Sequence, residues 1–101
     1  MDQIPRLSAI EMIILKLLLD HPQAYGLQLV KASGGKLKRG TIYVTLNRMR
    51  EKGYVESRRE SLSPNSGLPP RRLYWVTDHG LRVLQAWETV GASLVLGGAQ
   101  A

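Results

Sequence analysis

The sequence predicts a mainly α-helical domain with a small β-hairpin, an α+β fold class. One observation is an amphipathic helix over residues 40–52, which follows a basic turn and stops at Gly53. A second is the alternating segment 72–76, which is typical of a strand and leads directly into a further helix. A third is the loop-forming composition of residues 61–70, which separates this strand from the one before it.

The first helix is expected to begin after Ser8. Ser8 and Glu11 have the spacing of a capping box, in which each side chain binds the backbone amide of the other residue. Apolar residues cover nearly the whole circumference of this helix, and His21 and Pro22 end it. A helix of this kind is either central in the domain or buried against a second subunit.

A second helix is expected from about Ala24 to Ser33. Leu27 and either Val30 or Leu29 are its candidate inward positions. The glycine pair that follows this segment terminates it.

The third helix, over residues 40–52, has two different faces. At about 100° per residue, Ile42, Leu46 and Met49 fall on one side and form the predicted buried face. The opposite side carries Val44 and Asn47. Unpaired amides at the start of a helix add a partial positive charge there, so the N-terminal half of this helix can approach a polyanion.

Residues 54–58 and 72–76 form the two predicted strands, and the loop between them is a predicted wing. Thr77 is expected to cap a last helix, and the glycine pair 97–98 to begin a frayed tail. This order of elements predicts a winged helix-turn-helix.

The predicted organisation is a winged helix-turn-helix domain over residues 1–76, followed by a C-terminal dimerisation helix and tail over residues 77–101 in the same compact unit. The last helix carries an apolar stripe that is too large to leave in water at one end of a small domain. With two residues of the first helix, this stripe gives the predicted dimer interface: Ile13, Leu17, Val83, Leu84, Trp87, Val90 and Leu94.

The net charge of +6 is unevenly distributed. Residues 31–72 contain eleven lysines and arginines against three glutamates, whereas the rest of the chain carries a net charge of −2. A basic block of this kind is the expected footprint of phosphate binding. A solvated basic surface that keeps the protein soluble is the alternative, and charge by itself does not separate the two.

Composition also excludes several classes. The chain has no cysteine, which rules out disulfides and thiolate metal sites, and its two histidines lie far apart in sequence. We expect no metal and no cofactor. No apolar run approaches the roughly 18 residues of a membrane span, and the start does not resemble a secretion signal. We therefore expect a cytoplasmic protein, associated with the nucleoid when it binds DNA.

The chain resembles the PadR family of bacterial transcriptional regulators, in its short-tailed branch. The resemblance covers about residues 8–84 and is carried by Leu7-Ser8, Glu11, Leu15, Pro22, Tyr25-Gly26, Leu29, Gly40-Thr41-Ile42-Tyr43, Leu46-Asn47-Arg48, Glu51-Lys52-Gly53, Val55, Arg71-Arg72-Leu73-Tyr74, Thr77 and Gly80. Many members have proline where this chain has Val44. The resemblance implies a homodimer joined through its terminal helices that usually represses a nearby promoter. Some members respond to phenolic acids or lipophilic drugs at the dimer interface.

The expected partners are double-stranded DNA and a second copy of the chain. Asparagine can recognise adenine, arginine can recognise guanine, and hydroxyl groups suit phosphates. The predicted DNA-binding residues at the third helix are Thr41, Tyr43, Val44, Asn47 and Arg48, and those toward the phosphate backbone are Tyr25, Lys36, Lys38, Arg39, Arg71 and Arg72. Strand alternation points Arg71 and Arg72 to opposite faces, so only one of them is expected to touch DNA.

Several of these residues have alternative roles. Tyr43 could be a half-buried support for the helix, Tyr25 could pack against the third helix, and Asn47 could be an ordinary solvated residue. Arg48 and Arg50 could pair with neighbouring glutamates on the surface. Trp87 could pack in a dimer core or form an aromatic wall for a small aromatic ligand between two subunits.

Two other function classes compete with a DNA-binding regulator. An enzyme is disfavoured, because no thiol, paired carboxylates, phosphate-cradling glycine loop or histidine near a candidate nucleophile is present. A winged helix that binds protein or RNA is the remaining alternative, since a fold does not determine a function.

Overall fold

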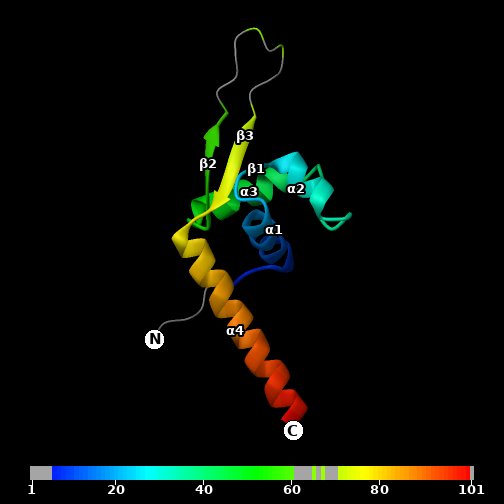
Figure 1. Cartoon of the computed structure of the whole chain (residues 1–101), viewed down its shortest axis with the longest axis vertical. Coiled ribbons are helices and arrows are strands. Elements are labelled where there is room, and N and C mark those ends of the chain that lie inside the picture. The colour runs from blue at the N-terminus through cyan, green and yellow to red at the C-terminus, as the bar shows by residue number, and fades with distance from the viewer. Residues whose placement is uncertain (1–5, 61–64, 66, 68–70, 101) are drawn as a thin grey trace.

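The structure, a computed structural model, describes residues 6–60, 65, 67 and 71–100, with only the backbone for residues 91–100. Its elements are α1 (Ala9–Asp20), β1 (Ala24–Tyr25), α2 (Gly26–Ala32), α3 (Ile42–Glu51), β2 (Val55–Arg59), β3 (Arg72–Val76) and α4 (Asp78–Gln100). The mainly α-helical class with a small sheet is confirmed. The hairpin and α4 extend in opposite directions from the body formed by α1, α2 and α3 (Figure 1).

The capping box that starts α1 is present as predicted. The Ser8 hydroxyl accepts a hydrogen bond from the Glu11 amide at 3.1 Å, and the Glu11 carboxylate accepts one from the Ser8 amide at 2.9 Å. At the other end, the His21 amide donates to the Leu17 carbonyl at 2.8 Å. Both ends of α1 are therefore determined by local sequence, as the capping rules require.

The second predicted helix starts too early, because Ala24 and Tyr25 form a strand. They pair antiparallel with Tyr74 and Leu73 of β3, so the sheet has the order β1-β3-β2. Tyr25 keeps an extended backbone and is the N-cap residue of α2. The edge of β3 offers these two residues backbone partners that a first helical turn would leave unsatisfied.

The inward face of α2 also differs from the prediction in part. Leu29 is fully buried and Val30 is half-buried, but Leu27 is 39% exposed. The helix has only seven residues, and its first residue, Gly26, is buried too. Gly26 and Leu29 lie three positions apart and define the buried side, which leaves Leu27 on the solvent side.

Helix α3 has the faces that its sequence predicts. Ile42, Leu46 and Met49 are buried, and Val44 on the opposite face is 53% exposed. The helix ends at Glu51, and Gly53 follows the C-cap residue Lys52 with a φ of 81° and an amide that donates to the Arg50 carbonyl. This is a Schellman cap, in which glycine adopts the left-handed conformation at no steric cost.

Thr77 connects the end of α3 to the start of α4. Its hydroxyl donates to the Gly53 carbonyl at 2.5 Å and accepts from the Gly80 amide at 2.9 Å, so the predicted cap is confirmed. A Cβ atom at Gly80 would overlap the backbone oxygen of Tyr54, which requires glycine at this contact. Helix α4 then continues to Gln100, so the prediction of a frayed tail from residue 97 is wrong.

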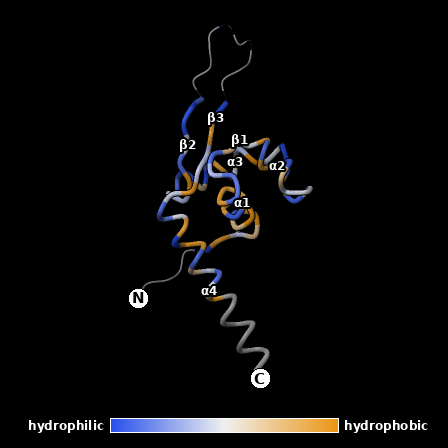
Figure 2. Tube along the Cα trace, viewed as in Figure 1, coloured by the Kyte–Doolittle hydropathy of each residue, from blue (hydrophilic) through white to orange (hydrophobic). Residues whose placement is uncertain are grey.

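The core lies where α1, α2 and α3 meet the sheet and the first turns of α4. Figure 2 shows α1 as a largely apolar segment and β2 as largely hydrophilic. The largest fully buried side chains come from each of these parts of the fold: Ile14, Leu15, Leu18, Leu29, Ile42, Leu46, Met49, Val55 and Leu84.

One ion pair with a buried carboxylate joins α1 to Lys52, the C-cap residue of α3. Glu11 is 5% exposed, and its carboxylate accepts a hydrogen bond from Lys52 at 2.8 Å. Burial alone would raise the pKa of Glu11, but the bonds from Lys52 and Ser8 outweigh it and hold the pKa below its ordinary value of 4.5. The ionised carboxylate therefore stabilises the fold.

This pair predicts a pH-dependent contribution to stability. A lowered folded-state pKa means that the contribution is present above the ordinary pKa of 4.5 and is lost as pH falls through the lower folded value. Glu11→Gln should reduce the free energy of unfolding on the order of 1 kcal/mol at neutral pH, allowing for solvent at the Lys52 end. Urea unfolding from pH 7 to pH 3 should show this difference shrinking below about pH 4.5.

Glu88→Gln is the matched control, because it makes the same change at an exposed position of α4. A difference between wild type and Glu11→Gln that stays constant over the whole pH range would contradict the assignment.

Candidate nucleic-acid interface

A large concavity, the wing-side cleft, lies between α2, α3 and β3. Its volume is about 1060 Å³. Most of its polar lining consists of cations and phenol or amide groups. The lining residues are Tyr25, Leu27, Gln28, Val30, Lys31, Arg39, Tyr43, Asn47, Arg71, Arg72 and Tyr74.

Hydrogen bonds and packing hold several of these side chains in place. The Arg72 guanidinium donates to the Ser57 hydroxyl at 3.0 Å, across the β2–β3 pair. The Tyr43 ring packs against Gly26 of α2. The contact is so close that a Cβ atom at this position would lie 2.7 Å from the ring. Burial raises the pKa of Tyr74, and the nearby cations Arg72 and Arg50 offset this only in part.

At the base of the wing, Arg71 lies between an aromatic ring and a carboxylate. Its guanidinium carbon is 4.1 Å from the centre of the Tyr25 ring, within cation–π distance. Its Nε atom is 3.8 Å from the Glu60 carboxylate. The interaction of the Tyr25 hydroxyl with the same carboxylate is the main reason that the pKa of Tyr25 is raised.

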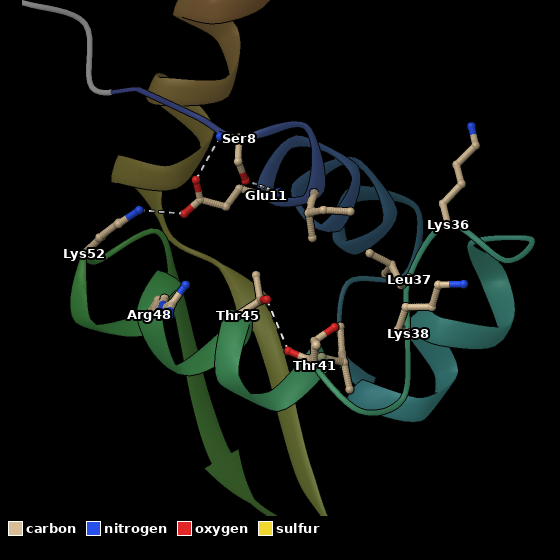
Figure 3. A pocket seen from close by; sticks show the side chains of 11 residues that line it. Ser8, Glu11, Lys36, Leu37, Lys38, Thr41, Thr45, Arg48 and Lys52 are labelled. Atoms are coloured by element: carbon tan, nitrogen blue, oxygen red, sulfur yellow. Dashed lines mark hydrogen bonds and ion pairs between the residues drawn. The ribbon is translucent and has the colours of Figure 1, made fainter.

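A second, smaller concavity, the α1-side cleft, lies on the other side of α3. Its volume is about 360 Å³. Figure 3 shows Lys36 and Lys38 projecting from the loop before α3, while Lys52 reaches toward Glu11. The lining residues are Ser8, Ile10, Glu11, Lys36, Leu37, Lys38, Thr41, Ile42, Thr45, Arg48 and Lys52.

The structure divides the predicted DNA-binding residues between the two clefts. Those that line the wing-side cleft are Tyr25, Arg39, Tyr43, Asn47, Arg71 and Arg72. Those that line the α1-side cleft are Lys36, Lys38, Thr41 and Arg48. Val44 borders neither cleft and lies on the exposed face of α3.

Some details differ from what the sequence suggests. Arg71 and Arg72 both line the wing-side cleft rather than facing opposite ways, because Arg71 precedes β3 and does not follow its alternation. Tyr43 is 43% exposed while its ring packs on Gly26, which agrees with the half-buried support that was its alternative role; its contact with DNA stays a prediction. Among the described residues, the arginines of α3 form no ion pair with a glutamate, and Arg50 donates instead to Ser57.

Sequence reasoning did not identify Lys31, Lys52, Glu11 and Glu60 as residues of this surface. Lys31 is in the last turn of α2, and its charge was the only signal. Glu11 was predicted only as part of the capping box, and Glu60 gave no signal. The cation that each glutamate contacts is distant in sequence; Glu11 and Lys52 are 41 residues apart.

The residues of the predicted dimer interface fall into two groups. Val83 and Leu84 are buried in the core of their own chain, so they offer little surface to a second one. Ile13, Leu17 and Trp87 are only partly buried against that core, and Val90 is half-buried. The side chain of Leu94 lies outside the described residues.

Two further properties concern the described residues alone. No helix among them is both long and apolar enough to cross a membrane. They also contain no cluster of three or more histidine, aspartate or glutamate side chains arranged to hold a metal ion.

The chain is similar to proteins of known family and structure. The profile of the Transcriptional regulator PadR-like family matches residues 14–86. A PadR family transcriptional regulator from Eggerthella lenta DSM 2243 is 32% identical with a TM-score of 0.73, over 90% of this chain and 79% of the other. A PadR family transcription regulator from Clostridium difficile R20291 is 26% identical with a TM-score of 0.74, over 92% of this chain and 97% of the other.

A more distant structure includes nucleic acid. Bacillus subtilis PadR in complex with operator DNA is 19% identical with a TM-score of 0.69, over 81% of this chain and 48% of the other, which shows a shared fold. No protein with curated annotation matches the sequence.

The family match extends over most of the chain, and the Eggerthella lenta structure supports it at 32% identity over 90% of this chain. Members of this family regulate transcription and are not enzymes. The chain belongs to the PadR-like family of transcriptional regulators.

Proposed function

We propose that this regulator is a sequence-specific DNA-binding protein that acts as a homodimer on an inverted-repeat operator and represses transcription. The observation that carries the proposal is the position of α3, whose exposed face lies between two clefts lined by cations. A helix in the major groove has a phosphate backbone on each side. Cations on both sides of one exposed helix suit this arrangement.

The proposed division of contacts follows from side-chain chemistry. The α1-side cleft would hold one backbone through Lys36, Lys38 and Arg48, and the wing-side cleft would hold the other through Arg39 and Arg72. Backbone contacts of this kind determine affinity and salt dependence. Asn47 is exposed near the middle of α3. Its side-chain amide can donate one hydrogen bond to a base edge and accept another from it.

A homodimer suits both the fold and the proposed DNA site. Helix α4 has 23 residues and extends away from the body (Figure 1). Trp87 and Val90 on this helix are only partly buried, so a second copy that covers them would remove more apolar surface from water. A dimer with two-fold symmetry presents two α3 helices to successive major grooves about 34 Å apart. A Bacillus subtilis protein of the same fold has been captured on operator DNA, which supports this mode. Such a regulator would act in the cytoplasm, where the DNA is.

Selection of genome fragments by the purified protein at about 150 mM salt, the ionic strength at which screening is physiological, tests the proposal as a whole. We expect enrichment of an inverted repeat. Binding to all fragments alike, with a steep fall as salt rises, would reduce the basic surface to a general polyanion binder and favour an RNA or protein partner.

Asn47 is predicted to distinguish one sequence from another. Asn47→Ala should weaken binding to the selected operator by roughly 1–3 kcal/mol, because a bidentate base contact is lost, and should leave binding to random duplex nearly unchanged. Fluorescence anisotropy with both duplexes measures the difference. Lys36→Ala is the contrast, since loss of a phosphate contact weakens both duplexes alike. Equal losses on the two duplexes for Asn47→Ala would show that this residue does not recognise a base.

Trp87 is predicted to stabilise the dimer. It is partly buried against the core of its own chain, and a large aromatic near an interface centre often contributes about 2 kcal/mol or more. Trp87→Ala should therefore raise the dimer dissociation constant about 30-fold, measured by sedimentation. Glu88→Ala, an exposed neighbour, should leave it unchanged. An unchanged dimer in a folded Trp87→Ala protein would place the interface elsewhere.

A further inference from the structure

Glu60 is a carboxylate in contact with the proposed DNA-binding surface. It follows β2 at the base of the wing, and its amide donates to the Arg71 carbonyl at 2.6 Å, so the backbone holds the two residues opposite each other. Its carboxylate lies 3.8 Å from the Arg71 Nε atom. Tyr25 and Arg71 both line the wing-side cleft, whereas Glu60 does not line it.

The pair between Arg71 and Glu60 is loose. Two ion pairs occur among the described residues, and the other, between Lys52 and Glu11, has a separation of 2.8 Å with a hydrogen bond. The Oε2 atom of Glu60 is buried and has no hydrogen-bond partner in the described part of the chain. A buried charged oxygen without a donor is unfavourable, so this contact costs little to open.

Arg71 does not depend on Glu60 for its position. Its guanidinium lies over the Tyr25 ring, with the guanidinium carbon 4.1 Å from the ring centre. This cation–π contact persists whichever anion binds the edge of the guanidinium. The side chain is 46% exposed, so an incoming oxyanion can reach it. Guanidinium binds carboxylate and phosphate oxygens with the same planar set of donors. One anion can therefore replace the other without rearrangement of the arginine.

We propose that the Glu60 carboxylate pairs with the Arg71 guanidinium in the free protein, and that a phosphate of the DNA backbone replaces this carboxylate when DNA binds. Glu60 would then lower the affinity of the protein for every duplex. The inference rests on the proposed function. A protein with this many cations on one surface would otherwise bind DNA of any sequence tightly. A carboxylate of the protein itself lowers this sequence-independent affinity. The base contacts then account for a larger share of the preference for one DNA site over another.

Glu60→Gln tests the proposal, with Glu56→Gln as a matched control. Glu56 lies on the same strand pair and is exposed, but it lines neither cleft. Binding of each full-length protein to a random-sequence duplex is measured by anisotropy between about 50 and 200 mM salt, the range over which phosphate contacts change affinity strongly. Glu60→Gln should bind roughly three- to tenfold more tightly, as removal of a partly exposed ion pair allows. Its salt slope should steepen by up to about 0.9, the value for one phosphate contact. Glu56→Gln should stay within about twofold of wild type, because screening weakens a distant exposed charge.

A second variant tests whether the gain acts through Arg71. In an Arg71→Ala background, Glu60→Gln should give no gain in affinity, because the guanidinium that it releases is gone. A gain that persists there would overturn the proposal in favour of a general charge effect. Weaker or unchanged binding by Glu60→Gln, in a wild type that binds duplex, would overturn it as well. Failure of wild type to bind any duplex would instead overturn the proposed function, and this inference with it.

Discussion

The geometry of the molecule depends on the contact between two short backbone segments, one that follows α3 and one that starts α4. Gly53 turns the chain with a positive φ, and its carbonyl accepts the Thr77 hydroxyl, while the Tyr54 carbonyl accepts the Thr77 amide. Gly80 brings the first turn of α4 against Tyr54 with no room for a side chain. These contacts set the end of α3, the root of the hairpin and the direction of α4 together. The exposed helix, the two hairpin strands and the proposed dimerisation helix are therefore positioned by the same few residues.

Electrostatics gives this frame its proposed function. The cations are distributed over both sides of α3 instead of forming one patch. A carboxylate contacts a cation on each side: Glu11 lines the α1-side cleft and binds Lys52, and Glu60 contacts Arg71 of the wing-side cleft. The two carboxylates differ in their surroundings. Glu11 is buried, fully hydrogen-bonded and structural, whereas Glu60 makes a longer contact with its cation. Removal of the Glu11 charge is therefore expected to lower the stability of the fold, whereas removal of the Glu60 charge is expected to raise the affinity for DNA.

Local patterns in the sequence predicted the elements that depend on near neighbours. The capping box at Ser8, the buried face of α3 and the Thr77 cap all involve residues within a few positions of each other, and all are present. Features that depend on distant partners could not be predicted in this way. Strand β1 has two residues, too few to show alternation, and exists because β3 offers it a free edge.

The candidate surface shows the same limit. Charge and helix periodicity identified most of its cations, but the separation into two clefts arises from the packing of α1 and of the hairpin on opposite sides of α3. The extent of α4 through Gly97 and Gly98 was also missed, because glycine lowers helix propensity without forbidding the helix.

The central claim is that α3 binds DNA between two phosphate backbones, one in each cleft. The most direct test is the salt dependence of operator binding for Lys38→Ala, Arg72→Ala and the double variant. If each residue neutralises one phosphate on its own side, each single change should reduce the salt slope by about 0.9 per protomer, and the double change by about twice that. A slope that responds to one of the two residues and not to the other would contradict the claim and leave a one-sided interface.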